Sequence, residues 1–435
     1  MTGTPREEYE TGKLLRRAVP RSSHAAWSPP GNRRNPVLTV LAQDERRLPD
    51  LVPLRHRRMA ASPFAFLCGA AAVMAGDLAS TPSTGLGVQA CGDAHVMNFG
   101  FYASPGRSLV FDLNDFDETL PGPWEWDLKR LAASLAVAAR DQGFGDEDAR
   151  DLARRAAAAY RLRMRELAAM PDLAVFSTVT RGDEVIEQIM KRGLRDRPKN
   201  LDQTHRRDRL PAVGTLTATV DGRLRIVEDP PLLVRDGTES TEDLVKHSLA
   251  EYSRSLREDV AELLSRYRFV DAARKVVGVG GVGTRCYVVV LQGRDAHDPL
   301  VLQIKEATRS VLEPHLYSSA YRNQGRRVVV GQRLLQSASD VFLGWSADGP
   351  GNYYWRRLRD LKSDIDPTTM NPYGLTLYAE LCARTLAVGH ANTGRRMRIA
   401  GYLGTSTVFD EAIAEFAMAY ADQTGRDHKI FTTVS

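Results

Sequence analysis

The chain has 435 residues, of which 43% are hydrophobic and 26% are charged, an ordinary composition for a folded protein with a sizeable core. Its Lys and Arg residues outnumber its Asp and Glu residues by only five, 59 against 54. This small surplus does not by itself indicate a nucleic-acid-binding protein. No apolar run is long enough to span a bilayer, and the charged, Pro-rich N-terminus lacks the apolar core of a secretory signal. We therefore expect a cytoplasmic protein without a membrane or nucleic-acid partner.

The first half of the chain predicts an irregular start followed by helices. Residues 1–50 read as an extended arm, because four prolines interrupt any helical pattern there. A capped, Ala-rich helix is expected over 62–78. A short buried strand is expected over 108–111. Apolar residues at helical spacing predict two longer helices, over 124–142 and 147–170.

The second half alternates between helical and strand-rich stretches. The basic segment 191–209 has no interleaved aromatic residues, so we interpret it as solvated surface. Alternating residues around an Asp-Gly pair predict a hairpin over 215–227. Residues 241–267 read as helix, 275–304 as strand-rich and 373–435 as helix again. The four cysteines form no Cys-x-x-Cys pair and are expected to be buried single thiols.

The strongest chemical signal is the sequence Gly-Asp-Ala-His-Val-Met-Asn at 92–98. Asp93 on such a loop can accept the proton of an attacking hydroxyl, and His95 is the second predicted catalytic residue. The amide oxygen of Asn98 and the carboxylate of Asp115 can hold Mg²⁺ against the phosphates of ATP. The residues predict a site for phosphoryl transfer.

This spacing resembles the kinase-like fold, especially its aminoglycoside and choline kinase branch. That branch carries His-Gly-Asp-x-His-x-x-Asn, then a strand ending in Asp-Phe or Asp-Trp, then a further Asp that braces the catalytic loop. The resemblance implies that Asp127 is the bracing residue. Cys91 stands where the branch has its first His. Asp115 is preferred as metal ligand because Phe116 follows it; the alternatives are Asp112 and Asp117.

A glycine-rich segment at 278–283 satisfies Gly-x-Gly-x-x-Gly. A dinucleotide-binding loop of this pattern opens a helix, whereas a kinase loop is a hairpin tip between two strands. Here the β-branched residues 285–291 follow, which favours the hairpin. Its backbone N–H groups would then lie over the nucleotide phosphates. The glycines predicted to bind nucleotide are Gly278, Gly280, Gly281 and Gly283.

Lys305 ends an apolar strand that is the second one after the glycine segment. It resembles the kinase lysine of Val-Ala-Ile-Lys, which contacts the α- and β-phosphates. Glu313 is predicted as its carboxylate partner, with Glu306 as the alternative.

The order of these motifs is circularly permuted relative to ordinary kinases, since the catalytic loop precedes the glycine segment. Permutation can preserve a site when the original termini lie close together. The hinge between lobes is then expected near 351–357. Helix 378–391 resembles a large-lobe helix of aminoglycoside-type kinases, and its His390 is interpreted as a packed structural residue. The expected fold is α+β and two-lobed, with a helical insertion.

This fold divides the chain into five expected segments. An N-terminal extended arm takes 1–50, and the catalytic-loop half of the large lobe takes 51–144. A mainly helical insertion follows over 145–270, and a β-rich, nucleotide-binding small lobe over 271–350. The hinge and the C-terminal helices of the large lobe take 351–435.

Nearly the whole chain is also similar to a bacterial family of unknown function. Cys68 departs from that family, whose members usually have Arg before the following glycine. The motifs that carry the similarity are Val19–His24, Arg58-Met59, Ser62–Phe64, Gly92–His95, Asn114–Thr119, Trp124–Arg130, Val277–Gly280, Gln303–Ala307, Ser339–Trp345 and Tyr420–Gln423.

Together the motifs predict an ATP- and Mg²⁺-dependent phosphotransferase acting on a hydroxyl of a small molecule or protein. Two alternatives use the same fold: a pseudokinase that binds nucleotide without turnover, and an AMP-transferase that binds ATP in reversed polarity. A dinucleotide-dependent dehydrogenase ranks last, because strand rather than helix follows the glycines.

Overall fold

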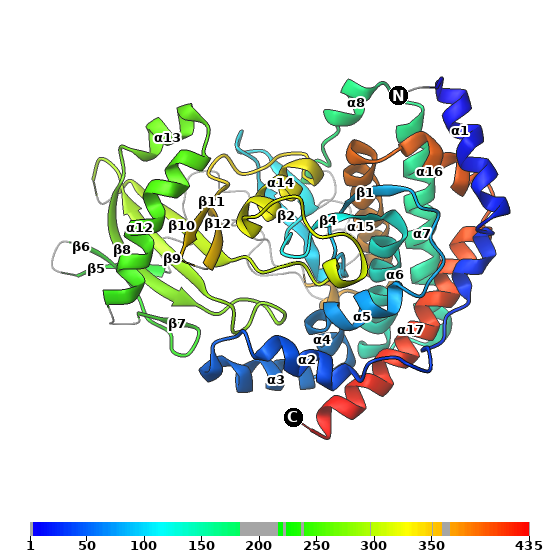
Figure 1. Cartoon of the computed structure of the whole chain (residues 1–435), viewed down its shortest axis with the longest axis horizontal. Coiled ribbons are helices and arrows are strands. Elements are labelled where there is room, and N and C mark those ends of the chain that lie inside the picture. Colours follow the sequence, from blue (N-terminus) through cyan, green and yellow to red (C-terminus); the bar gives the residue numbers. More distant parts are fainter. Residues whose placement is uncertain are drawn as a thin grey trace.

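The computed structural model describes residues 3–182, 216–220, 223–235, 239–295, 297–349, 351–358 and 366–434. These ranges combine α-helices with β-strands, as the sequence predicts (Figure 1). An antiparallel sheet with its own helices lies at one end of the molecule, and a larger helical part lies at the other. The basic segment 191–209 is outside the described residues.

The sheet has six strands in the order β11-β12-β10-β9-β8-β7, and every neighbouring pair is antiparallel. The stretch 351–357, near which the hinge is expected, is strand β12 in the interior of this sheet. Its aromatic residues pair with β10 and are buried. The strands are β7 (Leu233–Val234), β8 (Arg268–Lys275), β9 (Cys286–Gln292), β10 (Pro299–Glu306), β11 (Gly344–Asp348) and β12 (Gly351–Arg357).

The two faces of the sheet are covered differently. Ile304 of β10 packs with Trp355 and with Tyr252 of helix α12, whereas Val301 packs on the opposite face with the β5–β6 hairpin. Because neighbouring side chains of a strand point to opposite faces, Lys305 points away from α12. The covering elements are α12 (Glu239–Ser255), α13 (Glu258–Leu264), β5 (Thr217–Val220) and β6 (Arg223–Ile226).

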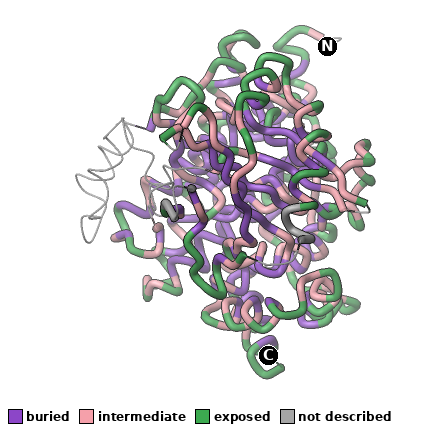
Figure 2. Tube along the Cα trace, turned by 90° about the vertical axis from the view of Figure 1, so that its left-hand side faces the viewer, coloured by how far each residue is buried: buried purple, intermediate pink, exposed green. Residues whose placement is uncertain are grey.

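Helix α6 runs through the middle of the helical part and is buried on almost every side, including the polar side chains in its first turns. Trp124 at its start stacks on Tyr160 of α7 with ring centroids 5.6 Å apart. Figure 2 shows the buried residues running through the interior of the molecule. The helices are α6 (Trp124–Asp141), α7 (Asp146–Ala168), α8 (Asp172–Phe176), α15 (Pro372–Thr393), α16 (Arg396–Leu403) and α17 (Val408–Thr432).

The first 50 residues are not an extended arm, and that prediction was wrong. They contain helices α1 (Pro5–Leu14) and α2 (Pro36–Asp44). Each begins with a proline, at a position where the missing N–H has no partner in any case. Helix α1 packs closely on α16, because a Cβ at Gly12 would lie 1.9 Å from the carbonyl oxygen of Arg398.

One further prediction needs correction. The helix expected over 62–78 is interrupted at Ala70, whose φ of −115° and ψ of 38° are not helical. The described residues of segment 145–270 are mostly helical, and the hairpin expected over 215–227 is the pair β5–β6. The helices expected over 124–142 and 147–170 are confirmed as α6 and α7.

Short elements connect the sheet to the helical part. Strands β1 and β4 form one antiparallel pair, and β2 and β3 form another. None of the helices in the described ranges combines the length and the apolar character that a bilayer crossing requires. The connecting elements are α3 (Val52–Ala60), α4 (Pro63–Gly69), α5 (Ala71–Leu78), β1 (Gly87–Ala90), β2 (Phe99–Ala103), β3 (Leu109–Leu113), β4 (Leu120–Pro123) and α14 (Gln324–Leu335).

Candidate active site

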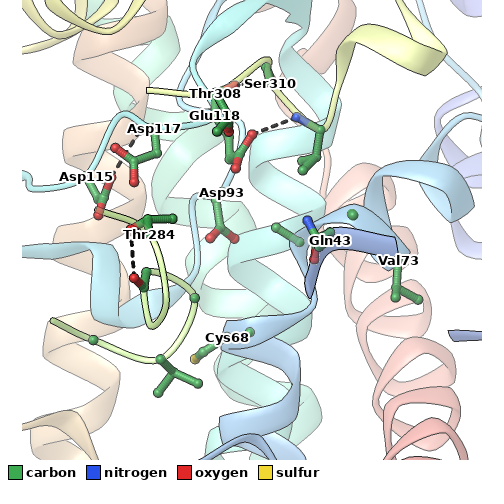
Figure 3. A pocket seen from close by; sticks show the side chains of 18 of the residues that line it. Gln43, Cys68, Val73, Asp93, Asp115, Asp117, Glu118, Thr284, Thr308 and Ser310 are labelled. Carbon is green, nitrogen blue, oxygen red and sulfur yellow. Dashed lines mark hydrogen bonds between the residues drawn. The ribbon is translucent and has the colours of Figure 1, made fainter. Parts of the chain in front are cut away.

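A cavity of about 1650 Å³ is lined by residues of the sheet and of the helical part. Its volume exceeds the roughly 300–1,000 Å³ of most small-molecule pockets, so a second molecule can accompany a ligand of ordinary size. Figure 3 shows acidic side chains gathered around this space, with Thr284, which directly follows the glycine segment, beside them. The predicted site residues that line it are Asp93, His95, Asn98, Asp115, Gly278, Gly280, Gly281, Lys305 and Glu313.

The loop that carries Asp93 is fixed by hydrogen bonds from its backbone to helix α6. Asp127, in the first turn of α6, accepts from the N–H groups of Cys91 and Gly92 at 2.6 and 2.9 Å. His390 of α15 lies 3.1 Å from the same carboxylate through Nε2. Gly92 has a φ of 87°, and a Cβ there would lie 2.3 Å from the carbonyl oxygen of Glu118. The bracing role predicted for Asp127 is confirmed, and His390 is a packed structural residue.

Asp93 is held by an arginine that the sequence analysis did not single out. Arg130 of α6 contacts Oδ1 of Asp93 through Nε at 2.9 Å and Nη2 at 2.7 Å. His95 lies farther away, with its Nε2 3.7 Å from Oδ2. Burial lowers the pKa of His95, so its imidazole is neutral at pH 7. Asn98 donates from its amide nitrogen to the backbone oxygen of Asp93 at 2.6 Å.

One signal in the sequence does reveal Arg130. Asp127, Arg130 and Ser134 stand at spacings of three and four residues within a mostly apolar helix, and so share one face. The hydroxyl of Ser134 accepts from the N–H of Val96 at 2.9 Å. This polar face of α6 therefore holds the whole Asp93 loop.

Lys305 lies between the two carboxylates that follow β3. Its Nζ is 3.1 Å from Oδ2 of Asp115 and also pairs with Asp117. Burial would raise the pKa of Asp115, but Lys305 and Arg356 outweigh it and hold that pKa well below its usual range. Burial, followed by the neighbouring Asp115, raises the pKa of Asp117.

The ammonium group of Lys305 stays charged in this buried place. Burial would lower the pKa of Lys305, but Asp115 and Asp117 hold it well above its usual range. Asp117 is fixed in turn by the hydroxyl of Tyr354, which donates to its Oδ1 at 2.8 Å. The alternative ligand Asp117 and the preferred ligand Asp115 thus occupy one site.

The carboxylate expected beside Lys305 is not there. Glu313 lines the cavity on a short 3₁₀ turn, but the ion pairs of Lys305 within the described residues go to Asp115 and Asp117. The alternative, Glu306, pairs with Arg285 at 3.1 Å. The two aspartates follow β3 directly and already neutralise the ammonium.

The glycine segment is the tip of the β8–β9 hairpin, as the strand that follows it predicts. Gly278 and Gly283 have positive φ values of 63° and 89°, which favour glycine. A Cβ at Gly281 would lie 3.7 Å from Cε of Lys305, so the tip lies directly over the lysine. Gly283 does not line the cavity, contrary to prediction; it packs against Arg47 instead.

Glu118 is a further acidic group in the cavity that was not predicted. It accepts from the N–H of Val311 at 2.7 Å, and burial raises its pKa to about 7. Its loop is fixed by Arg327 of α14, which donates to the carbonyl oxygens of Thr119 and Thr308 at 2.6 and 2.8 Å.

The donor set fits a magnesium ion. Asp115, Asp117 and Asn98 offer only oxygen ligands, which Mg²⁺ prefers. The amide nitrogen of Asn98 is engaged with Asp93, which leaves its oxygen as the free donor. Within the part of the chain that the structure describes, no three His, Cys, Asp or Glu side chains gather closely enough to hold a metal alone. Such a site suits Mg²⁺, which usually takes further ligands from phosphates and water.

Comparison with known proteins yields one finding. The model of a bacterial family described as "Uncharacterized protein conserved in bacteria (DUF2252)" matches residues 47–434. No curated protein and no solved structure matches the chain.

Proposed function

The chain belongs to this bacterial family, and we propose that it is an ATP-dependent phosphotransferase with a circularly permuted, kinase-like arrangement. The observation that carries the proposal is the placement of Lys305. It lies under the glycine hairpin and contacts Asp115, in a cavity that Asp93 also lines. These groups come from segments about two hundred residues apart.

Each group has a role that its position supports. The glycine hairpin would contact the phosphates through its backbone N–H groups, and Lys305 would contact them through its ammonium. Asp115, Asp117 and Asn98 would hold Mg²⁺, which neutralises charge on the phosphates when it is bound.

The reaction forms a bond between the acceptor oxygen and the γ-phosphorus. The bond from that phosphorus to the bridging oxygen breaks, ADP leaves, and Asp93 accepts the hydroxyl proton. Arg130 keeps the Asp93 carboxylate in place. Most of the rate enhancement would come from positioning and from fixed charges.

The test is ADP formation from Mg·ATP with a panel of hydroxyl acceptors. We expect turnover by the unmodified protein and a loss of about a thousandfold or more in Asp115→Ala, whose folding is checked by thermal unfolding. Asp259→Ala, which removes an exposed carboxylate on α13, should keep full turnover. Unchanged turnover in Asp115→Ala would contradict the proposed role of Asp115 in phosphoryl transfer. Mass spectrometry of the product separates phosphate transfer from AMP transfer.

A further inference from the structure

Arg47 lies in the turn after α2 and lines the cavity at the glycine hairpin. Its guanidinium donates through Nη1 to the carbonyl oxygen of Val282. The next residue, Leu48, donates its N–H to the carbonyl oxygen of Gly283 at 2.8 Å. A Cβ at Gly283 would lie only 2.9 Å from Cβ of Arg47. The arginine is therefore held tightly against the hairpin tip.

Nearby carboxylates only partly balance the positive charge of this largely buried guanidinium. Only 11% of its side chain is exposed, and its nearest carboxylate, Asp44, lies 3.9 Å away. Asp44 is already engaged by Arg55 at 2.6 Å and by His56 at 2.7 Å. The Nε of Arg47 is buried and makes no hydrogen bond within the described residues, because the carboxylate of Asp44 at 3.9 Å is too distant for one. A buried charge without a full partner is costly, so an anionic ligand would stabilise it.

The charges of the surrounding site also favour an anionic ligand at Arg47. Lys305 is shared between Asp115 and Asp117, so its single positive charge is already balanced by these two carboxylates before a polyphosphate binds. Burial, followed by repulsion from Arg55, lowers the pKa of Arg47 to about 10, and the guanidinium stays charged at neutral pH. Arg47 is thus a cation at the hairpin tip that is available to a phosphate group.

We infer that Arg47 binds a phosphate group of the nucleotide, as a second cation beside Lys305. The inference rests on the proposed function and names a residue from a segment that ordinary kinase motifs do not contain. Arginine suits this role, because its planar guanidinium can donate to two phosphate oxygens at once. The hydrogen bond to Val282 would hold the group ready for the ligand.

Arg58 provides a matched control. It also donates to a carbonyl oxygen of the glycine segment, that of Gly278, but it does not line the cavity. If both arginines merely support the hairpin, which would itself contact the phosphates, loss of either one should weaken the phosphate-bearing nucleotides to the same extent. If Arg47 also binds phosphate, its loss should weaken ATP binding more than the loss of Arg58 does.

The experiment is a calorimetric titration of Mg·ATP, Mg·ADP, AMP and adenosine into the unmodified protein, Arg47→Met and Arg58→Met. For Arg47→Met we expect an affinity loss of about tenfold or more for ATP, as for one charge-assisted hydrogen bond, and less than about twofold for adenosine. For Arg58→Met, which alters only the support of the hairpin, we expect a smaller loss for ATP than for Arg47→Met, and an equal loss in both variants would overturn the inference. Arg47→Lys keeps the charge and should show the same selective loss at smaller size if Arg47→Met does not fold.

Two results separate the possible failures. If the unmodified protein binds ATP but the Arg47 variants lose ATP and adenosine equally, or lose neither, the inference about Arg47 is wrong and the proposed function stands. If the unmodified protein binds no Mg·ATP, the proposed function itself fails.

Discussion

The two walls of the cavity are built in different ways. On the helical side, Asp93 and its loop are fixed by buried side chains of α6, namely Asp127, Arg130 and Ser134. On the sheet side, the glycine hairpin is held from outside, through its carbonyl oxygens, by a separate segment of the chain. The helical wall is thus part of a hydrophobic core, whereas the hairpin lies at the edge of the sheet and is held by hydrogen bonds from another segment of the chain. Substitutions in the helical wall should mainly lower stability, and substitutions in the glycine hairpin should mainly weaken ligand binding.

Lys305→Met should have the largest effect, because Lys305 joins the walls. It would remove the cation that Asp115 and Asp117 share, at a loss of about 3–5 kcal/mol of unfolding free energy at pH 7. The deficit should shrink at acidic pH, because the unpaired carboxylates then protonate. Urea unfolding at several pH values measures this. Lys13→Met, at an exposed pair, should change stability by less than about 0.5 kcal/mol, and an equal loss there would refute the argument.

Asp127→Ala tests the helical wall alone. It removes the acceptor of two backbone N–H groups, and each unsatisfied group costs about 1–3 kcal/mol. We expect a loss of about 2–4 kcal/mol in urea unfolding, against none for the exposed Asp259→Ala. A stable Asp127→Ala protein would mean that the loop does not depend on α6.

Glu118 gives the cavity a distinct dependence on pH. Burial raises its pKa from 4.5 to about 7 in the folded state, so the folded protein binds more protons than the unfolded chain between these values. Stability should therefore fall as pH rises from about 4.5 to 7 and then level off. Glu118→Gln should remove this slope and gain about 1–2 kcal/mol above pH 7, after allowance for solvent screening. A slope identical to that of the unmodified protein would contradict the assignment; Glu258→Gln, at an exposed site, is the control.

Gly278→Ala should have the smallest effect on stability. Its φ of 63° is left-handed, and a Cβ there meets no atom within 4 Å, so only the backbone strain of about 1 kcal/mol remains. Thermal unfolding should show that small decrease. A much larger loss would mean that the hairpin tip is part of the folded core after all.

The sequence predicted the sheet-side motifs well because their signals are local. Strands flank the glycines, and alternation alone places Lys305 on the cavity face. It predicted the Asp93 loop for the same reason. It did not reveal Arg47, since nothing near that residue indicates contact with a hairpin more than 230 positions away. The helices of the first 50 residues were missed because prolines usually interrupt a helix, whereas Pro5 and Pro36 stand at the first positions of α1 and α2.

Glu313 shows a different limit. Its position along the chain is compatible with an ion pair to Lys305. Which carboxylate forms that pair depends, however, on which loop enters the cavity. Asp115 and Asp117 come from the helical side and form the ion pairs with Lys305. A pairing between two walls is a property of the tertiary structure.

The two walls are proposed to bind one Mg·ATP between them. Calorimetric titration of ATP with and without Mg²⁺ into the unmodified protein and Asp115→Asn tests this. We expect one site per chain, tighter with Mg²⁺ than without it, and loss of that Mg²⁺ dependence in Asp115→Asn. Binding that ignores Mg²⁺ in both proteins, or no binding of ATP at all, would contradict it.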